Sequence, residues 1–234
     1  MNGNRGPLAG ICAALGIHHQ TFSTCVFLMG LNMMGTTYHF YYVKVFLNKF
    51  HITEGWFQAS QALFLVWNAV NDPVFGYFQD VGSGWTRSRK KCILYGSPFC
   101  AVGFLLFWFP WGDYESGAAH GWLVGVHFIA ALMVYDGFFS FAGIAWVSLY
   151  SELSTEHAAR VRAMKYNQCF MMISVNIVVL MEKYSSSLQN FSNFQHASLF
   201  VAGISLLCMS YTGAYAPGKA AQLSSFKHLQ VVLY

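Results

Sequence analysis

Three polar residues interrupt an apolar stretch near residues 57–78. Asn68, Asn71 and Asp72 fall within little more than one helical turn, and Pro73 follows them directly. A charged side chain in hydrocarbon costs roughly 2.5–3.5 kcal/mol on insertion scales, so it usually faces a bundle interior or a water-filled path. Pro73 has no backbone donor and kinks a helix, which frees carbonyl oxygens beside the carboxylate. The pattern indicates a cation or polar-solute site, or else a polar cluster that holds helices together.

Two further polar residues lie inside later apolar stretches. Asp136 is predicted to line the same cavity as Asp72, or alternatively to bond Tyr or Ser neighbours between helices. Gln168 could bond a hydroxylated solute, or another helix. No Lys or Arg lies in the helices expected to face Asp72. We therefore expect that carboxyl to be protonated or cation-bound, with H⁺ or Na⁺ as the coupling ion.

A third group of residues lies at the end of the 57–78 stretch, just beyond it, and in a later basic loop. Asp80 is expected to pair with a basic side chain at the helix end, and Gly76 to permit close helix approach. Arg160 lies in a second basic loop. The basic residues that follow Asp80 are Arg87, Arg89, Lys90 and Lys91. They would also anchor their loop at an anionic leaflet, at about 1 kcal/mol each.

The elements that must position these residues are long apolar segments. The chain has 234 residues, of which 56% are hydrophobic and 9% charged, whereas ordinary soluble domains carry about 25% charged residues. Segments of about 20 apolar residues can span a bilayer. The fold class is therefore all-α, a polytopic membrane protein with a six-transmembrane-helix bundle. The expected segments lie near 21–42, 57–78, 93–111, 122–150, 164–182 and 197–216.

The basic residues also predict the orientation. Ten of the 13 Lys and Arg lie in loops 79–92 and 151–163, just beyond them, or near the two termini. By the positive-inside rule these parts face the cytoplasm. Residues 21–216 would form the bundle and 217–234 a cytoplasmic tail. Residues 1–20 would be a tail, an interfacial segment or the leading turn of the first helix, unless residues 7–17 span and move the N-terminus outside.

Other motifs are few. Asn190 begins a glycosylation sequon, Asn-Phe-Ser, in the loop 183–196 that this topology places outside. The six cysteines form no C-x-x-C pair, so we expect neither a disulfide framework nor a metal site. A net charge of +4 does not suggest a nucleic-acid partner. With no nucleophile–base pair, histidine box or phosphate loop, we expect no enzyme and no cofactor.

Two blocks of sequence resemble a known family. WNAVNDPVFGYFQD with the basic run after it, and AWVSLYSELSTEHAARVRAMKYNQ at 145–168, are similar to the glycoside-pentoside-hexuronide:cation symporters, a branch of the major facilitator superfamily. The resemblance implies a fold of two six-helix halves and sugar transport coupled to a cation. This chain departs from the branch pattern in having Asn68 where an acidic residue is usual, and Gln168 near a usual basic residue. Asp72 is retained.

The resemblance also bears on the extent of the chain. Six helices make one half of such a transporter, the N-terminal one, and alternating access needs a second half. We expect a truncated form of a cation symporter whose partners are the lipid bilayer, an unidentified small solute, and a missing C-terminal half or second copy. The alternative is a non-transporting membrane protein, a regulatory or dimerising isoform. Either would be a multi-pass protein of the plasma membrane or an endomembrane.

Overall fold

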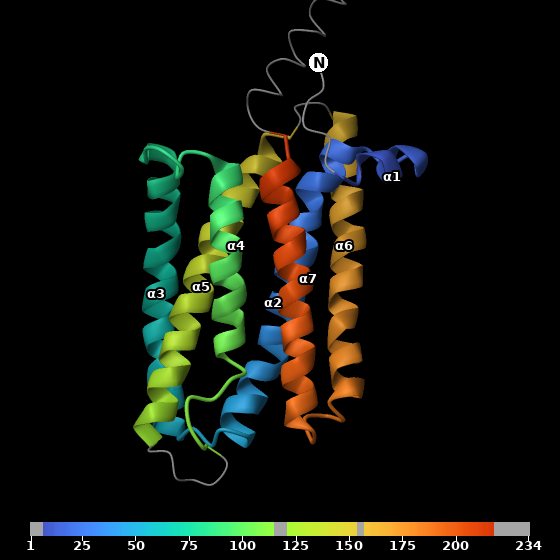
Figure 1. Cartoon of the computed structure of the whole chain (residues 1–234). Coiled ribbons are helices and arrows are strands. Elements are labelled where there is room, and N and C mark those ends of the chain that lie inside the picture. Colours follow the sequence, from blue (N-terminus) through green and yellow to red (C-terminus); the bar gives the residue numbers. More distant parts are fainter. Residues whose placement is uncertain (1–6, 115–120, 154–156, 218–234) are drawn as a thin grey trace, which may run out of the picture.

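The computed structural model describes residues 7–114, 121–153 and 157–217, and within these ranges the chain forms helices joined by loops, without a β-strand. Six long helices run alongside one another, and a short one projects sideways from one end of the bundle (Figure 1). The helices are α1 (Ala9–Ala14), α2 (His19–Asn48), α3 (Glu54–Val81), α4 (Arg89–Leu106), α5 (Gly121–Ser151), α6 (His157–Tyr184) and α7 (Phe191–Tyr215).

The all-helical class is confirmed for the described residues, and each expected apolar segment lies on its own long helix. Helices α5, α6 and α7 are long and apolar enough to cross a membrane. The other three long helices, α2, α3 and α4, do not meet this requirement for length and apolar composition. Helix α4 has 18 residues and begins with Arg89, Lys90 and Lys91, while α3 carries the polar cluster around Asp72. The count of six spans therefore stays a prediction.

The four helices α2, α4, α5 and α7 form the interior of the bundle. Helix α4 packs between α5 and α7, and α2 packs against α6 and α7. Two glycines allow these close contacts: a Cβ on Gly30 would lie 2.7 Å from the Ser205 carbonyl oxygen, and one on Gly103 would lie 2.8 Å from Cα of Tyr135. Small residues serve this purpose in membrane helices, where backbone approach replaces hydrophobic attraction.

Aromatic side chains fill the space between the inner helices. Phe27, Phe46 and Phe128 are fully buried. Phe27 stacks on Trp146, with ring centroids 5.6 Å apart and planes 13° apart. The Trp146 indole nitrogen donates to the Thr24 carbonyl at 2.8 Å and so joins α5 to α2. A buried indole commonly finds such a partner, because an unpaired N–H would be costly.

Helix α2 also buries several Ser and Thr hydroxyl groups that bond within the helix. Ser23 and Thr24 donate to the Gln20 carbonyl at 3.0 and 3.1 Å, and Thr37 donates to the Met33 carbonyl at 2.8 Å. Bonds of this kind back to the preceding helical turn are typical of Ser and Thr inside helices. The hydroxyls therefore need no partner on a neighbouring helix.

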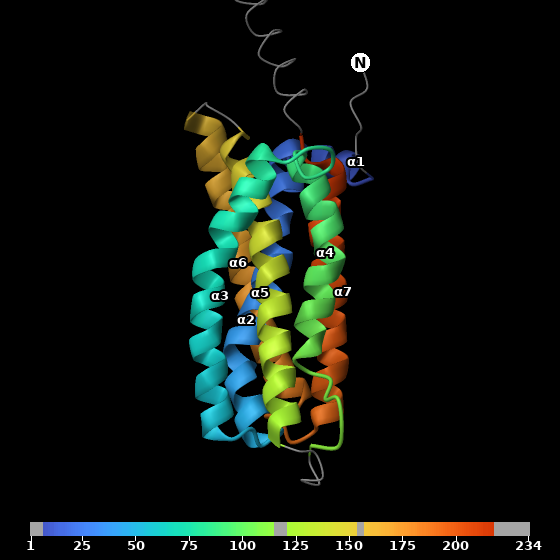
Figure 2. The ribbon, with the colours of Figure 1, turned by 90° about the vertical axis from the view of Figure 1, so that its left-hand side faces the viewer.

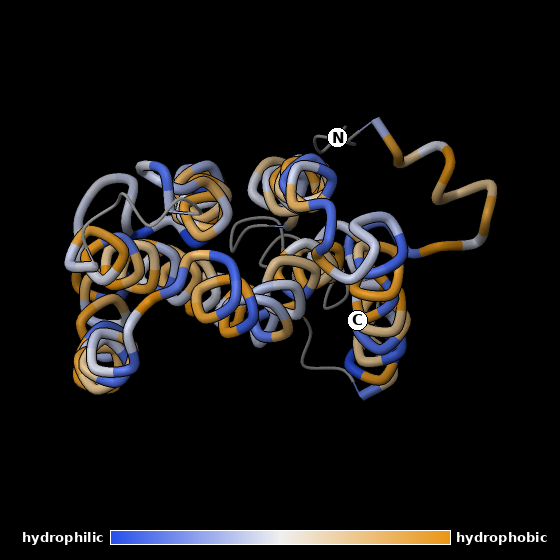
Figure 3. The backbone as a smooth tube through the Cα atoms, turned by 90° about the horizontal axis from the view of Figure 1, so that it is seen from below, coloured by the Kyte–Doolittle hydropathy of each residue, from blue (hydrophilic) through white to orange (hydrophobic). Residues whose placement is uncertain are grey.

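Helices α3 and α6 stand at two edges of the bundle, and each packs mainly on one neighbour, α3 on α5 and α6 on α2 (Figures 1 and 2). Both expose large apolar side chains, for example Leu65 at 72% and Met172 at 70%. Viewed along the helices, apolar residues lie on the outer flanks as well as between the helices (Figure 3). Such surfaces suit contact with hydrocarbon or with a further bundle.

The segment before the bundle is a separate short helix rather than a leading turn of α2. Gly16, with φ +67°, separates α1 from α2, and His18 caps the start of α2, since its Nδ1 accepts from the Thr21 amide at 3.4 Å. Helix α1 has six residues, about 9 Å of helix, too short to span a bilayer. An interfacial role stays a prediction, and residues 1–6 and 218–234 lie outside the described part.

Candidate functional site

A pocket of about 400 Å³ lies between α2, α3 and α5. It contains the two carboxylates that the sequence singled out, together with amide, hydroxyl and aromatic side chains. Its lining residues are Gly35, Tyr38, His39, Tyr42, Gln61, Phe64, Asn68, Asp72, Leu132, Tyr135, Asp136, Phe139 and Ser140. The structure therefore brings together Asn68, Asp72 and Asp136, as predicted.

Asp136 is held at both carboxylate oxygens by α3. Asn71 donates from Nδ2 to Oδ2 at 2.5 Å, and Asn68 donates from Nδ2 to Oδ1 at 3.2 Å. The two amides are three residues apart, so they lie on the same side of the helix and face α5 together. Asn71 is buried, with 2% of its surface exposed, whereas Asn68 is exposed. Asn71 is therefore the better shielded of the two donors.

Asp72 has a different environment from Asp136. It is exposed on the open side of the pocket, four residues after Asn68. Helix α3 continues through Pro73, which cannot donate to the Ala69 carbonyl, so that oxygen lacks its helical donor. Two carboxylates that share a pocket repel each other unless a proton or a cation lies with them. Among the lining residues there is no Lys or Arg, and His39 is the one basic side chain.

Several polar atoms around the pocket are buried without a hydrogen-bond partner. They include Gln61 Nε2, Asn71 Oδ1 and the Tyr135 hydroxyl. Buried polar groups are normally paired, and Gln61 and Tyr135 line the pocket, so their unpaired atoms can serve a polar ligand. An aromatic wall completes the pocket, because Tyr38 and Tyr42 stack with ring centroids 4.7 Å apart and planes 20° apart.

Gln168 is not part of this pocket. It is exposed on α6, which packs mainly against α2, and it is absent from the residues that line the cavity. The sequence grouped it with Asp72 and Asp136 because all three are polar residues inside apolar stretches. Which helices adjoin one another decides the grouping, and that depends on tertiary packing.

At the other end of α3, Asp80 pairs with Arg89 of α4, so the sequence was right to expect a basic partner there. A residue that the sequence reasoning missed lies beside this pair. Gln79 has 1% of its surface exposed; its Oε1 accepts from Arg89 Nη1 at 3.2 Å and its Nε2 donates to the Phe141 carbonyl at 2.7 Å. It ties α3 to both α4 and α5. A glutamine beside an aspartate at a helix end gave no signal of burial.

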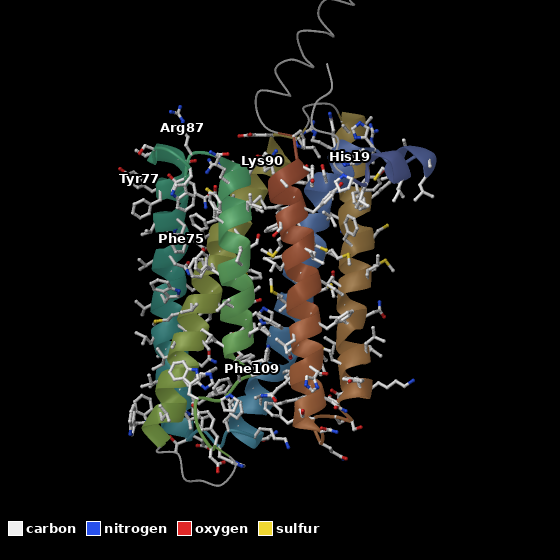
Figure 4. The ribbon with its side chains drawn as sticks, in the orientation of Figure 1. His19, Phe75, Tyr77, Arg87, Lys90 and Phe109 are labelled. Carbon is white, nitrogen blue, oxygen red and sulfur yellow. The ribbon has the colours of Figure 1, made fainter. Side chains whose placement is uncertain are left out.

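The other residues of the predicted loop motif are placed as follows. Arg87 is exposed and extends away from the bundle end (Figure 4), where it lines a pocket of about 300 Å³ with Asp80 and Glu152. Arg160 is exposed at the start of α6. The close helix approach expected at Gly76 is not made by the described residues, because nothing lies within 4 Å of a Cβ built there. Gly76 instead faces open space.

Asn190 lies at the opposite end of the bundle from Asp80. It is exposed and occupies the cap position before α7. Exposure is what a glycosylation acceptor requires, and its use stays a prediction.

Comparison with known proteins adds the following. A family model described as "MFS/sugar transport protein" matches residues 25–225. The chain is 28% identical over 128 residues to "Transmembrane protein 180" of Mus musculus, covering 49% of this chain and 23% of that protein. It is 24% identical over 190 residues to the protein of the same name from Gallus gallus, covering 76% of this chain and 35% of that protein. The chain thus matches little more than a third, at most, of these relatives' length.

Proposed function

The chain belongs to the MFS/sugar transport protein family, and on this premise we propose that it forms part of a membrane transporter that couples a cation to a small polar solute. The observation that carries the proposal is the pair of carboxylates in one pocket. Asp136 is held by two amides from α3, and Asp72 lines the same cavity. A pocket with this donor set, inside a bundle of membrane helices, is a place where a cation can bind.

The coupling ion is proposed to be H⁺ or Na⁺. Carboxylate, amide and carbonyl oxygens are the ligands that hard cations prefer. Asn68 and Asn71 each donate one hydrogen bond to Asp136, and the amide oxygen of Asn68, which lines the pocket, stays available to a ligand. Without a cation, a proton shared between the carboxyls would relieve their repulsion.

The solute is proposed to be a hydroxylated molecule of the size of a simple sugar. The stacked rings of Tyr38 and Tyr42 offer an apolar face, while Gln61 and Tyr135 carry buried polar atoms without partners. Ligand pockets typically combine an apolar or aromatic lining with a few polar groups that fix orientation. Cavities used by ligands commonly start at about 300 Å³, and this one is about 400 Å³.

The pocket is proposed to be half of a larger one. Asp72 and Asn68 are exposed on its open side, and secondary transporters place the substrate between two halves that rock against each other. A C-terminal half or a second copy would cover this side. In this arrangement all six long helices cross the membrane, with the end that carries Arg87 and Lys90 in the cytoplasm.

Ion binding by the purified chain in detergent tests the proposal. Titration calorimetry with NaCl, with choline chloride as the blank, should give saturable heat that weakens as the pH is lowered, because protons compete for the same carboxyls. Asp136→Asn and Asp72→Asn should each abolish the heat. Glu54→Gln, which removes an exposed carboxylate at the start of the same helix, should leave it unchanged. Heat that survives both aspartate substitutions would refute the site, and so would the absence of both Na⁺ binding and a carboxyl titration.

A further inference from the structure

A second cavity lies on the outside of the bundle, apart from the polar pocket. It is a groove of about 670 Å³ between α3, α4 and α5. Its lining is almost wholly apolar and mostly aromatic, and it includes Phe75, Trp85, Tyr95, Phe99, Phe138 and Phe141. Trp85, Tyr95 and Phe99 are 46%, 49% and 56% exposed, so the groove is open to whatever surrounds the protein.

The groove ends at the basic end of the bundle. Phe75 lies along α3, below Arg87 and Lys90 in Figure 4, and Trp85 lies in the connection that leads to α4. Trp and Tyr concentrate at the level of lipid headgroups, where an apolar ring meets water. In the topology proposed above, on which this inference rests, the groove runs from the headgroup level into the hydrocarbon.

The first three residues of α4 differ in what they contact. Arg89 pairs with Asp80 and Gln79 of α3. Lys90 donates from Nζ to the Ala214 carbonyl at 3.1 Å, at the end of α7. Lys91 is exposed, and no hydrogen bond or ion pair joins it to another residue of the described part. Arg89 and Lys90 thus bind groups of the bundle, whereas Lys91 stays at its surface.

Lys91 is aligned with the groove. Tyr95 follows it by four residues and Phe99 by eight, so all three lie along one stripe of α4. An unpaired cation at the headgroup level, above an open aromatic groove, matches a molecule with an anionic head and an apolar tail.

From this arrangement we propose that the groove binds one anionic glycerophospholipid, with its acyl chain against Tyr95, Phe99 and Phe138 and its negatively charged headgroup at Lys91. A basic residue at an anionic membrane surface contributes about 1 kcal/mol to binding, which corresponds to about a fivefold change in affinity. Burial of the acyl chain against aromatic and aliphatic side chains supplies the rest of the binding free energy. That part does not discriminate between headgroups. The site accordingly selects the lipid by charge.

Native mass spectrometry of the detergent-purified chain, with added phosphatidylserine or phosphatidylcholine, measures this selection. Lys91→Gln should weaken phosphatidylserine retention about fivefold and leave phosphatidylcholine retention unchanged. Lys165→Gln is the matched control, because it removes an exposed lysine at the same end of the bundle, on α6, away from the groove. Equal losses in the two variants, or no loss in Lys91→Gln, would overturn the proposal.

A second measurement locates the acyl chain directly and does not depend on a variant. Phosphatidylserine with a photoreactive diazirine in its chain is bound, illuminated and mapped by peptide mass spectrometry. Adducts should concentrate on Tyr95, Phe99 and Phe138. Adducts distributed equally over the exposed apolar side chains of α6, such as Met172 and Val179, would show general lipid contact and refute a site.

Discussion

Replacing Asn71 by Ala should weaken the bundle more than replacing Asn68 by Ala, although both amides donate to Asp136. Asn71 is buried and donates at 2.5 Å, whereas Asn68 is exposed and donates at 3.2 Å. Side-chain hydrogen bonds between membrane helices average about 0.6 kcal/mol and reach about 1.7 kcal/mol. The buried bond of Asn71 belongs near the upper figure. The longer, exposed bond of Asn68 belongs below the mean.

A double-mutant cycle with Asp136→Ala isolates these bonds, because it cancels what each substitution does by itself. The coupling energy should be about 1–1.7 kcal/mol for Asn71 with Asp136 and below about 0.6 kcal/mol for Asn68 with Asp136. The free energy of unfolding of the purified chain in mixed micelles supplies the four values of each cycle. Equal couplings, or a larger one for Asn68, would mean that Asn71 does not hold the carboxylate, and the geometry of the site would be wrong.

Three other predictions concern the ends of the bundle. An epitope inserted at residues 186–187 should be reached by antibody in intact cells and one at 83–84 only after permeabilisation; reversed access would invert the topology. Asn190→Gln should remove a glycosidase-sensitive shift in mobility, and a parent chain without that shift would contradict an outside loop. Partial desolvation of the His18 ring, together with the positive charges of Arg162 and His19, lowers the pKa of His18 from 6.5, so the unfolded chain binds more protons and stability should fall as the pH drops below about 6.5. His18→Asn keeps a capping acceptor and should flatten that dependence in thermal unfolding from pH 5 to 8, whereas an unchanged slope would exclude His18 as its source.

Much of the helical framework followed from hydropathy, because each long helix needs an apolar stretch of its own. The ends were less predictable. The segment expected at 93–111 became a helix that ends at Leu106, and the expected 21–42 became His19–Asn48. Aromatic and polar residues near the ends of an apolar segment are compatible with either helix or loop. Local contacts therefore decide where each helix ends.

For the candidate site, sequence reasoning grouped Asn68, Asp72 and Asp136 but did not foresee how each of them is held. Sequence reasoning favoured Asp72 because it lies inside an apolar stretch beside Pro73 and is the acidic residue of the family pattern that this chain retains. In the structure Asp136 is the carboxylate held by two amides, while Asp72 lies exposed on the open side. The partners of Asp136 come from a helix more than 60 residues earlier, and no local pattern encodes that pairing. Gln79 escaped notice for the same reason.

The order of synthesis gives the internal hydroxyl bonds of α2 a further meaning. Helix α2 packs mainly on α6 and α7, and α7 begins at Phe191 whereas α2 ends at Asn48. At about 5–20 residues per second, roughly 140 residues take about 7–28 s to make. During that interval α2 lacks its permanent neighbours. Ser23, Thr24 and Thr37 already donate to carbonyls of their own helix, so these three hydroxyls need not recruit a wrong partner while α2 waits for α6 and α7.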